Sequence, residues 1–291
     1  MIEPSRFFAR RWVRILAALL VAVALFVIYD AWRAREESAL AANAAIEITY
    51  VGLPDTLHKL GVLAPGFDVD KEGSVLVVPG SGGLAMIDQD RDLWREAAGG
   101  RRFDSAAFDG TTILATSGGF FGRINDQGRF DEGVPLPYNA ARLFRSADPG
   151  VVYLAGGYLG EWRLYRFEEQ GRYRIVLATD AEIVGAVDGN GAVWVATRAR
   201  LLKLDSRGTH VAFIAPHDPA FGLITSLALT PNGDPLVATD KAVWIVNPRG
   251  EANTLINNAG GELRQLGRRT YVLDRRRELL FYFTDGRQGG D

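Results

Sequence analysis

Six copies of one short strand pattern recur along this chain, and their spacing constrains the fold more than any other feature. Each copy is a run of β-branched and aromatic residues that follows a turn rich in Gly, Asn or Asp. A second alternating run comes after a short polar gap. Aligned on one position, the copies lie 35 to 42 residues apart, at Val77, Ala115, Leu154, Val195, Val237 and Val272. Repeats of this length with several short strands each are typical of β-propeller blades rather than of helical arrays.

The late repeats show the strands of a blade most clearly. In the fifth repeat, ITSLALTPNG, PLVAT, AVWIVNPRG and EANTLIN read as four successive strands and their turns. The sixth repeat offers only three strands before the chain ends, and Ile46–Val51 (IEITYV) predicts the missing outer strand. Such a closure joins the two ends of the ring and removes an exposed sheet edge. The predicted fold is therefore all-β, a six-bladed β-propeller over residues 46–286 closed by an N-terminal strand, with a tail at 287–291.

The N-terminal segment has a different character, because it is almost entirely aliphatic. Residues 12–32 would form a helix of roughly 31 Å at about 1.5 Å per residue, enough to cross a bilayer. The expected anchor residues are the basic and aromatic side chains at or near the two ends of this span: Arg11, Trp12, Arg14, Tyr29 and Trp32. The excess of arginine before the span places residues 1–11 in the cytoplasm and the propeller outside, with 33–45 as a helical linker. A cleaved signal peptide and a buried core helix are the alternatives.

Composition excludes several kinds of chemistry. The chain has no cysteine, which excludes disulfides, thiol nucleophiles and thiolate metal sites, and it has only three histidines. Its 33 basic residues are balanced by 35 acidic ones, so no basic footprint points to nucleic acid. Metalloprotease, nucleophile-elbow and phosphate-loop motifs are also absent from the sequence. We therefore expect no nucleic-acid partner and no cofactor.

The blade sequences carry a family resemblance. DGNGAVWVAT in the fourth repeat and ITSLALTPNGDPLVATDKAVWIVNPRG in the fifth resemble the propeller repeats of bacterial two-component-regulator sensors. They are also similar to NHL, SMP-30/gluconolactonase and virginiamycin B lyase-type blades. An anchor followed by a six-bladed propeller further resembles the strictosidine-synthase-like membrane proteins. The resemblance to SMP-30 implies a divalent metal held by acidic and amide side chains in the channel. Asp68, Asp104 and Asp188 are the weak candidates for such a site.

Two further features suggest binding surfaces. Arginines concentrate in the last repeat, at Arg268, Arg269, Arg275, Arg276 and Arg277, as expected of a docking patch for an acidic surface or anionic head groups. Pro137, Tyr138 and Phe221 would expose apolar and aromatic groups on one face, and His217 lies in the longest late connection beside Asp218. We expect these nine residues to bind a partner.

The missing catalytic motifs, the anchor and the protein-sized platform together favour a non-catalytic scaffold. The sequence thus predicts an accessory subunit of a multi-subunit complex in a bacterial inner membrane, with the propeller in the periplasm and integral membrane proteins as partners. One alternative is a propeller hydrolase or lyase with a channel metal. Another is a ligand-sensing propeller that signals through a partner.

Overall fold

The structure is a computed structural model of the 291-residue chain. It describes residues 21–29 and most of 46–285; the residues outside the description are 1–20, 30–45, 52–56, 58, 59, 62, 89–92, 139, 140, 147, 149, 169–171, 190, 206, 207, 209, 215–220, 248, 250 and 286–291. The chain divides into a unit of residues 1–42 and a unit of residues 43–291, and each is described by itself.

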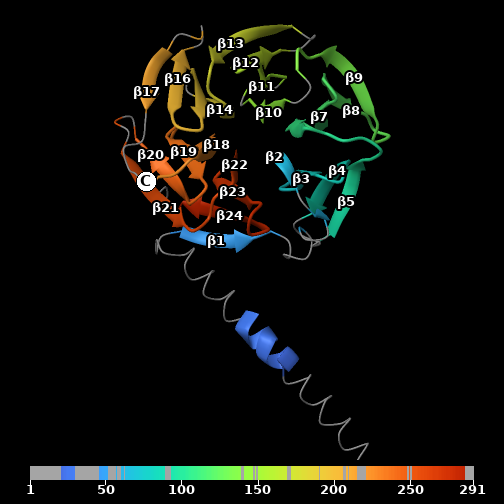
Figure 1. Ribbon diagram of the computed structural model, residues 1–291, viewed down its shortest axis with the longest axis vertical. Helices are drawn as coiled ribbons and strands as arrows, with labels where there is room; N and C mark the ends of the chain where they lie inside the picture. Colours follow the sequence, from blue (N-terminus) through green and yellow to red (C-terminus); the bar gives the residue numbers. More distant parts are fainter. Residues whose placement is uncertain are drawn as a thin grey trace, which may run out of the picture. The chain divides into compact units, whose positions relative to one another are not determined.

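The larger unit is a closed ring of six four-stranded antiparallel sheets (Figure 1). Blade one contains β2 (Leu63–Val69), β3 (Val75–Pro79), β4 (Leu84–Asp88) and β5 (Leu93–Ala98). Blade two contains β6 (Ser105–Asp109), β7 (Thr112–Ser117), β8 (Phe120–Ile124) and β9 (Phe130–Pro135). Blade three contains β10 (Arg142–Arg145), β11 (Val152–Tyr158), β12 (Glu161–Phe167) and β13 (Tyr173–Thr179). Blades four and five contain β14 (Ile183–Gly189), β15 (Ala192–Thr197), β16 (Leu201–Asp205) and β17 (His210–Ile214); and β18 (Ile224–Leu229), β19 (Pro235–Thr239), β20 (Ala242–Val246) and β21 (Ala252–Asn257). Blade six contains β22 (Glu262–Leu266), β23 (Arg269–Asp274), β24 (Leu279–Asp285) and β1 (Ile46–Tyr50).

This arrangement confirms the six blades and the closing strand. β1 pairs with β24 from Ile46 opposite Asp285 to Tyr50 opposite Phe281, so the first strand completes the last blade. The six aligned positions of the repeat all lie in the second strand of their blades. Every one of them is fully buried: Val77, Ala115, Leu154, Val195, Val237 and Val272. The repeat thus marks one equivalent core position in each blade, where an aliphatic side chain packs between neighbouring sheets.

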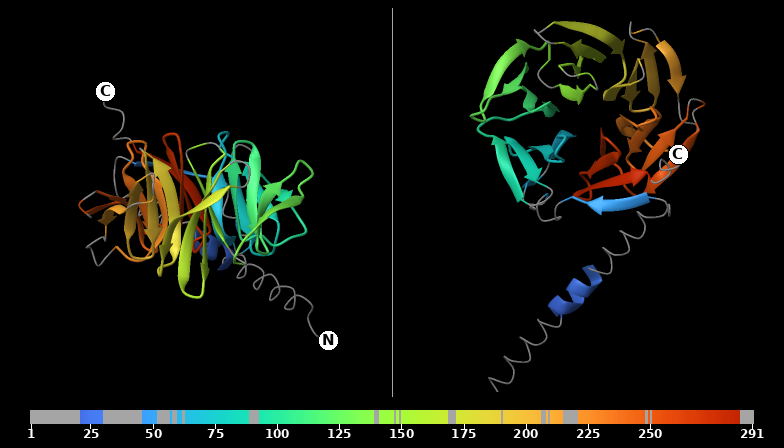
Figure 2. Two further views of the ribbon diagram at one scale, coloured as in Figure 1. Left: turned by 90° about the horizontal axis from the view of Figure 1, so that it is seen from above. Right: turned by 180° about the vertical axis from the view of Figure 1, so that it is seen from behind.

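Strand alternation sorts the loops onto two faces of the ring, and Figure 2 shows the strands running between them. We call the upper face the one with the turns between second and third strands and with the first residues of the inner strands. The lower face has the other two sets of turns. Because β1 pairs antiparallel with β24, Ile46 lies beside the last residue of β24, at the lower face.

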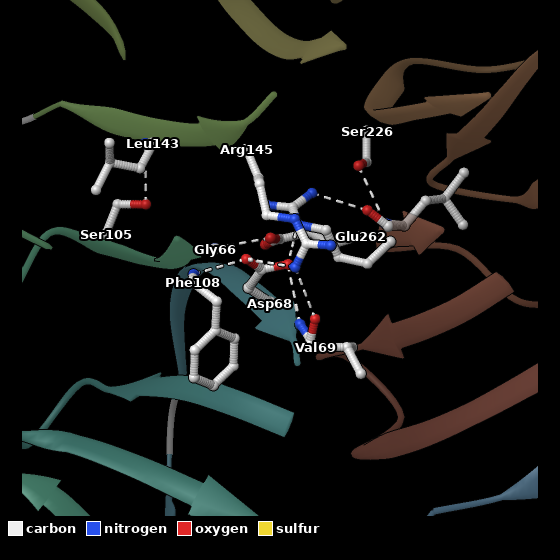
Figure 3. Close-up of polar contacts among 11 residues, drawn as sticks. Gly66, Asp68, Val69, Ser105, Phe108, Leu143, Arg145, Ser226 and Glu262 are labelled. Carbon is white, nitrogen blue, oxygen red and sulfur yellow. Dashed lines mark hydrogen bonds and ion pairs between the residues drawn. The ribbon is translucent and has the colours of Figure 1, made fainter. Parts of the chain in front are cut away.

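Side chains of the inner strands also bond to the next blade around the channel (Figure 3). Four buried oxygens accept backbone N–H groups across blade boundaries: Asp68 from Phe108 at 2.8 Å, Ser105 from Leu143 at 3.0 Å, Ser226 from Leu263 at 3.0 Å and Glu262 from Gly66 at 2.7 Å. Inner strands do not pair with each other in a propeller, so these bonds satisfy backbone groups that no ladder reaches.

Residues 21–29 form a helix whose apolar side chains are exposed, including Phe26 at 68% and Ile28 at 64%. Within the described residues no helix is both long and apolar enough to cross a membrane. Of the predicted anchor residues, Tyr29 is in this helix, whereas Arg11, Trp12, Arg14 and Trp32 lie outside the described residues. The membrane anchor therefore stays a prediction.

Gly156 in β11 provides a test of how blade three is packed. A Cβ built at Gly156 would overlap the ring of Tyr138, which lies directly over it. We expect Gly156→Ala to lower the free energy of unfolding by about 1–3 kcal/mol, because the ring cannot occupy its present place. Thermal unfolding followed by circular dichroism checks this. Gly99→Ala is the control, because Gly99 is exposed, has no positive φ, and its added Cβ would meet only the flexible end of the Glu96 side chain. An unchanged midpoint for Gly156→Ala would contradict the described packing.

Candidate functional site

A network of five charged side chains lies at the upper end of the channel. Glu182 accepts hydrogen bonds from Arg142 and Arg198, each at 2.8 Å. Arg275 lies 3.2 Å from Glu262, whose other oxygen accepts the Gly66 N–H. Burial lowers the pKa of the Arg142 guanidinium, and the neighbouring glutamates Glu182 and Glu262 oppose that change. These residues come from blades three, four and six, so the network, here called the upper cluster, joins the mouth of the channel across three blades.

A cavity of about 540 Å³ opens beside the upper cluster. Its charged lining residues are Arg198, Asp240, Asp274, Arg275, Arg276, Arg277 and Glu278. Its other lining residues are Leu57, Gly61, Leu63, Thr225, Gly260, Gly261 and Leu273. This volume falls within the usual range for small-molecule sites. Half of the lining residues are charged, so the cavity suits a polar ligand.

Asp240 is the carboxylate of this cavity best placed to act on a ligand. Its Oδ1 accepts the Leu223 N–H at 2.9 Å, which fixes the orientation of the side chain. Gly222 has a φ of +81°, and a Cβ there would overlap the same oxygen, so the close approach requires glycine. Within the described part of the chain Asp240 forms no ion pair. Asp274, in contrast, is occupied by Arg277 at 2.8 Å and by backbone N–H groups of its own turn.

The structure separates the five arginines of the predicted docking patch. Arg268 and Arg269 lie at the lower end of β23, where Arg269 covers the ring of Tyr282. Arg275, Arg276 and Arg277 lie at its upper end and line the cavity. At about 3.3 Å per residue the strand holds the two groups roughly 20 Å apart. The prediction of one continuous patch is wrong, because a strand runs between its two halves.

The prediction that Tyr138 and Phe221 are exposed on one face is also wrong. Tyr138 is 7% exposed and packs against Tyr165, and Phe221 is 4% exposed with its ring 5.1 Å from Trp244. Tyr138 is covered because Gly156 leaves room for its ring inside blade three. Pro137 is exposed, and His217 lies outside the described residues. Partner binding by the nine residues therefore stays a prediction.

The three candidate metal ligands do not converge. Asp68 is buried, accepts the N–H groups of Val69 and Phe108, and faces two guanidinium groups. Asp188 accepts the hydroxyls of Ser146 and Tyr153 in the lower half of the channel, and Asp104 precedes β6 on the upper face. The described residues contain no group of three acidic or histidine side chains that could hold a metal ion. We therefore derive no chemistry through a metal.

Asp104 provides a pH-dependent test of the upper face. Burial raises its pKa above 3.8, and Oδ2 has no hydrogen-bond partner among the described residues; Arg102 and the Gly118 N–H oppose the shift only in part. A raised folded-state pKa means that the charged form destabilises the fold above that pKa. We expect Asp104→Asn to raise the melting temperature at pH 7 by about 1–3 °C, a gain below about 1 kcal/mol for this half-buried group. The gain should shrink as pH falls toward 3.8. A gain that is equal at pH 7 and pH 3.5 would contradict this account.

Sequence reasoning missed the acidic members of this site and two of its arginines, Arg142 and Arg198. Arg142 and Glu262 begin inner strands, and Glu182 immediately precedes one. The available signal was their position, since the first residues of inner strands all reach the channel mouth on the upper face. Their pairing was not readable, because Arg142 and Glu182 come from adjacent blades and lie 40 residues apart.

Comparison with known proteins places the fold more firmly than the function. No protein-family model and no curated protein matches the chain. Among solved structures it is similar to a gluconolactonase from Xanthomonas campestris, with a TM-score of 0.64 at 11% identity over 82% of this chain and 89% of that one. A virginiamycin B lyase from Staphylococcus aureus, solved with quinupristin, gives 0.59 at 13% identity over 82% and 99%. A luciferin-regenerating enzyme gives 0.64 at 10% identity over 82% and 95%.

These identities establish the propeller fold and assign no activity to this chain by themselves. They nevertheless correct the prediction of a non-enzyme, because these similar structures are enzymes built on the same fold. The prediction rested on the absence of linear catalytic motifs. A ring that assembles its site from several blades needs no such motif. The missing motifs therefore give no ground for calling the protein a non-enzyme.

Proposed function

We propose that this protein is a propeller hydrolase that acts on a small ester or lactone bound in the cavity beside the upper cluster. One observation carries the proposal: an oriented carboxylate, Asp240, shares a cavity of about 540 Å³ with Arg198, Arg275 and Arg276. A carboxylate that can accept a proton beside groups that can stabilise negative charge is the minimum that acyl transfer to water requires.

In the proposed reaction, Asp240 acts as general base. It takes a proton from a water molecule as the water oxygen bonds to the carbonyl carbon of the substrate. Negative charge then develops on the carbonyl oxygen, and the guanidinium groups of Arg275 and Arg276 stabilise it. When the bond to the leaving oxygen breaks, Asp240 returns the proton to that oxygen, so an ester gives a carboxylic acid and an alcohol and a lactone gives one hydroxy acid.

The upper cluster holds Arg275, and Arg198 beside it, in position. Glu182 fixes Arg198 through a hydrogen bond, and Glu262 faces Arg275. Arg142 ties the two glutamates together electrostatically from blade three. Groups held in advance by ion pairs need little reorganisation when charge develops in the transition state, which is the source of their catalytic effect.

A hydrolysis assay on the full chain tests the proposal. The substrates are γ-butyrolactone, a sugar δ-lactone and a short-chain aryl ester, with proton release and product followed at several substrate concentrations. We expect saturable turnover of at least one substrate above the buffer rate. An absence of turnover across the panel would overturn the hydrolase, and an unsaturated product would assign elimination in its place.

The cellular setting is a separate proposal. We retain a single-pass inner-membrane anchor at residues 12–32, a periplasmic propeller and integral membrane partners, on the support of the apolar composition and flanking arginines of that span. Alkaline carbonate extraction of native membranes tests the anchor. A protein that stays with the membrane pellet would support it, and release into the supernatant would contradict it.

A further inference from the structure

A second cavity lies in the lower half of the channel, apart from the proposed active site. It measures about 260 Å³ and is lined by residues of five inner strands or their ends. Its polar wall consists of Asp68, Arg145, Ser146, Asp188, Arg264 and Gln265. None of these residues lines the cavity beside the upper cluster, so the channel holds two distinct polar spaces.

The strongest feature of the lower cavity is a buried carboxylate between two guanidinium groups (Figure 3). Asp68 Oδ2 lies 3.8 Å from Arg145 Nη1, and Asp68 Oδ1 lies 3.6 Å from Arg264 Nε. The two oxygens already accept the N–H groups of Phe108 and Val69 at 2.8 and 2.9 Å. One carboxylate bound mainly to the backbone therefore stands against two positive charges.

Both guanidinium groups retain donor capacity. Arg145 donates to the Val69 carbonyl at 3.0 Å and Arg264 to the Leu263 carbonyl at 2.8 Å, out of five N–H donors each. The Arg264 side chain is only 13% exposed, and its Nε is buried and has no hydrogen-bond partner among the described residues. An unmet buried donor on a cavity wall is costly unless a ligand or water satisfies it.

The opposite wall is suited to a hydroxyl group. Asp188 is positioned by hydrogen bonds from Ser146 at 2.5 Å and Tyr153 at 3.3 Å, and a carboxylate accepts hydroxyl donors readily. The volume of about 260 Å³ corresponds to roughly nine water molecules at about 30 Å³ each. That space suits a ligand of about seven non-hydrogen atoms.

We infer that the lower cavity binds a small hydroxy acid, with its carboxylate on Arg145 and Arg264 and a hydroxyl toward Asp188. The inference does not depend on the proposed hydrolysis, because it uses residues of the other end of the channel. Glycerate has this size and this arrangement of groups, and glycerol is the matched neutral molecule.

Isothermal titration of the full chain with sodium glycerate tests the inference, with glycerol and sodium chloride titrated separately at matched concentration. We expect saturable heat for glycerate alone. Arg145→Gln should weaken binding at least tenfold; Asp68 keeps Arg264 and two backbone donors in that variant. Gln265→Glu, which adds a negative charge to the wall, should also weaken binding. Arg123→Gln, exposed on β8, should bind as the unaltered protein does.

Three results would overturn the inference. The first is the absence of saturable heat, or equal heats from glycerate and sodium chloride. The second is glycerate binding that neither Arg145→Gln nor Gln265→Glu weakens, with folding of both variants checked by circular dichroism. The third is loss of binding in Arg276→Gln, which would place glycerate in the cavity beside the upper cluster. A failure of hydrolysis with intact glycerate binding would leave this inference standing.

Discussion

Asp240→Asn is expected to lower the turnover number for the best substrate of the panel by about 10²–10⁴-fold, the range typical for loss of a general base. The amide can still accept the Leu223 N–H through its oxygen, so the loop should keep its shape. It cannot accept a proton from water. The Michaelis constant should change little, because the substitution removes an interaction of the transition state rather than of the bound substrate.

Asp234→Asn is the matched control for this experiment. Asp234 belongs to the same blade, in the turn between β18 and β19 on the lower face, and its backbone N–H bonds to Thr230. The control should keep the unaltered turnover number. If Asp240→Asn kept more than about a tenth of the activity, Asp240 would not be the base.

Asp68→Asn is expected to give the largest loss of stability of any conservative change in the channel. Both carboxylate oxygens face backbone N–H donors, so the amide group of asparagine must turn its own N–H toward one of them. One buried donor then loses its acceptor, and Arg145 and Arg264 lose their counter-charge. Burial raises the pKa of the Asp68 carboxyl, so removal of its charge also relieves a desolvation cost and offsets part of this loss. We expect a net cost of about 1–3 kcal/mol and a melting temperature lower by about 2–12 °C.

Thermal unfolding at pH 7 measures this effect, with Asp126→Asn as the control. Asp126 is exposed in the turn between β8 and β9, and its substitution should leave the midpoint within about 1 °C. A midpoint for Asp68→Asn that matched the control would mean that the contacts of Asp68 do not stabilise the ring.

The fold was readable from the sequence because a propeller repeats the same local pattern. Val77 and its five equivalents recur at blade spacing. The sixth repeat has only three strands of its own, which predicted that a strand from elsewhere in the chain, here Ile46–Tyr50, completes that blade. Burial of one equivalent position in each blade is a local property, set by strand alternation and turn residues. Such information survives in a single chain without any knowledge of neighbours.

The site was less readable because it depends on contacts between blades. Arg268 and Arg275 are close in sequence, yet β23 carries them to opposite faces. Tyr138 looked like an exposed aromatic, and its burial follows from Gly156 on the adjacent strand. The separation of two residues by a strand, and the space that a glycine leaves for a neighbouring ring, can be seen only in the assembled structure.

The absence of catalytic motifs misled the functional prediction for a related reason. The proposed general base, Asp240, is one carboxylate in a turn, and Arg198 and Arg275, which line the same cavity, lie in other blades. No spacing along the chain identifies that group. What identifies it is the shared cavity and the backbone donor of Leu223 that orients the side chain.

The most direct test of the central claim is turnover measured before and after removal of divalent metal. The full chain is treated with excess chelator, desalted and assayed, and then assayed again with calcium, magnesium, manganese or zinc added back. Because Asp240 and the arginines perform the proposed chemistry, we expect the activity to stay within about twofold throughout. Loss of activity on chelation and its recovery with one of these metals would contradict the account.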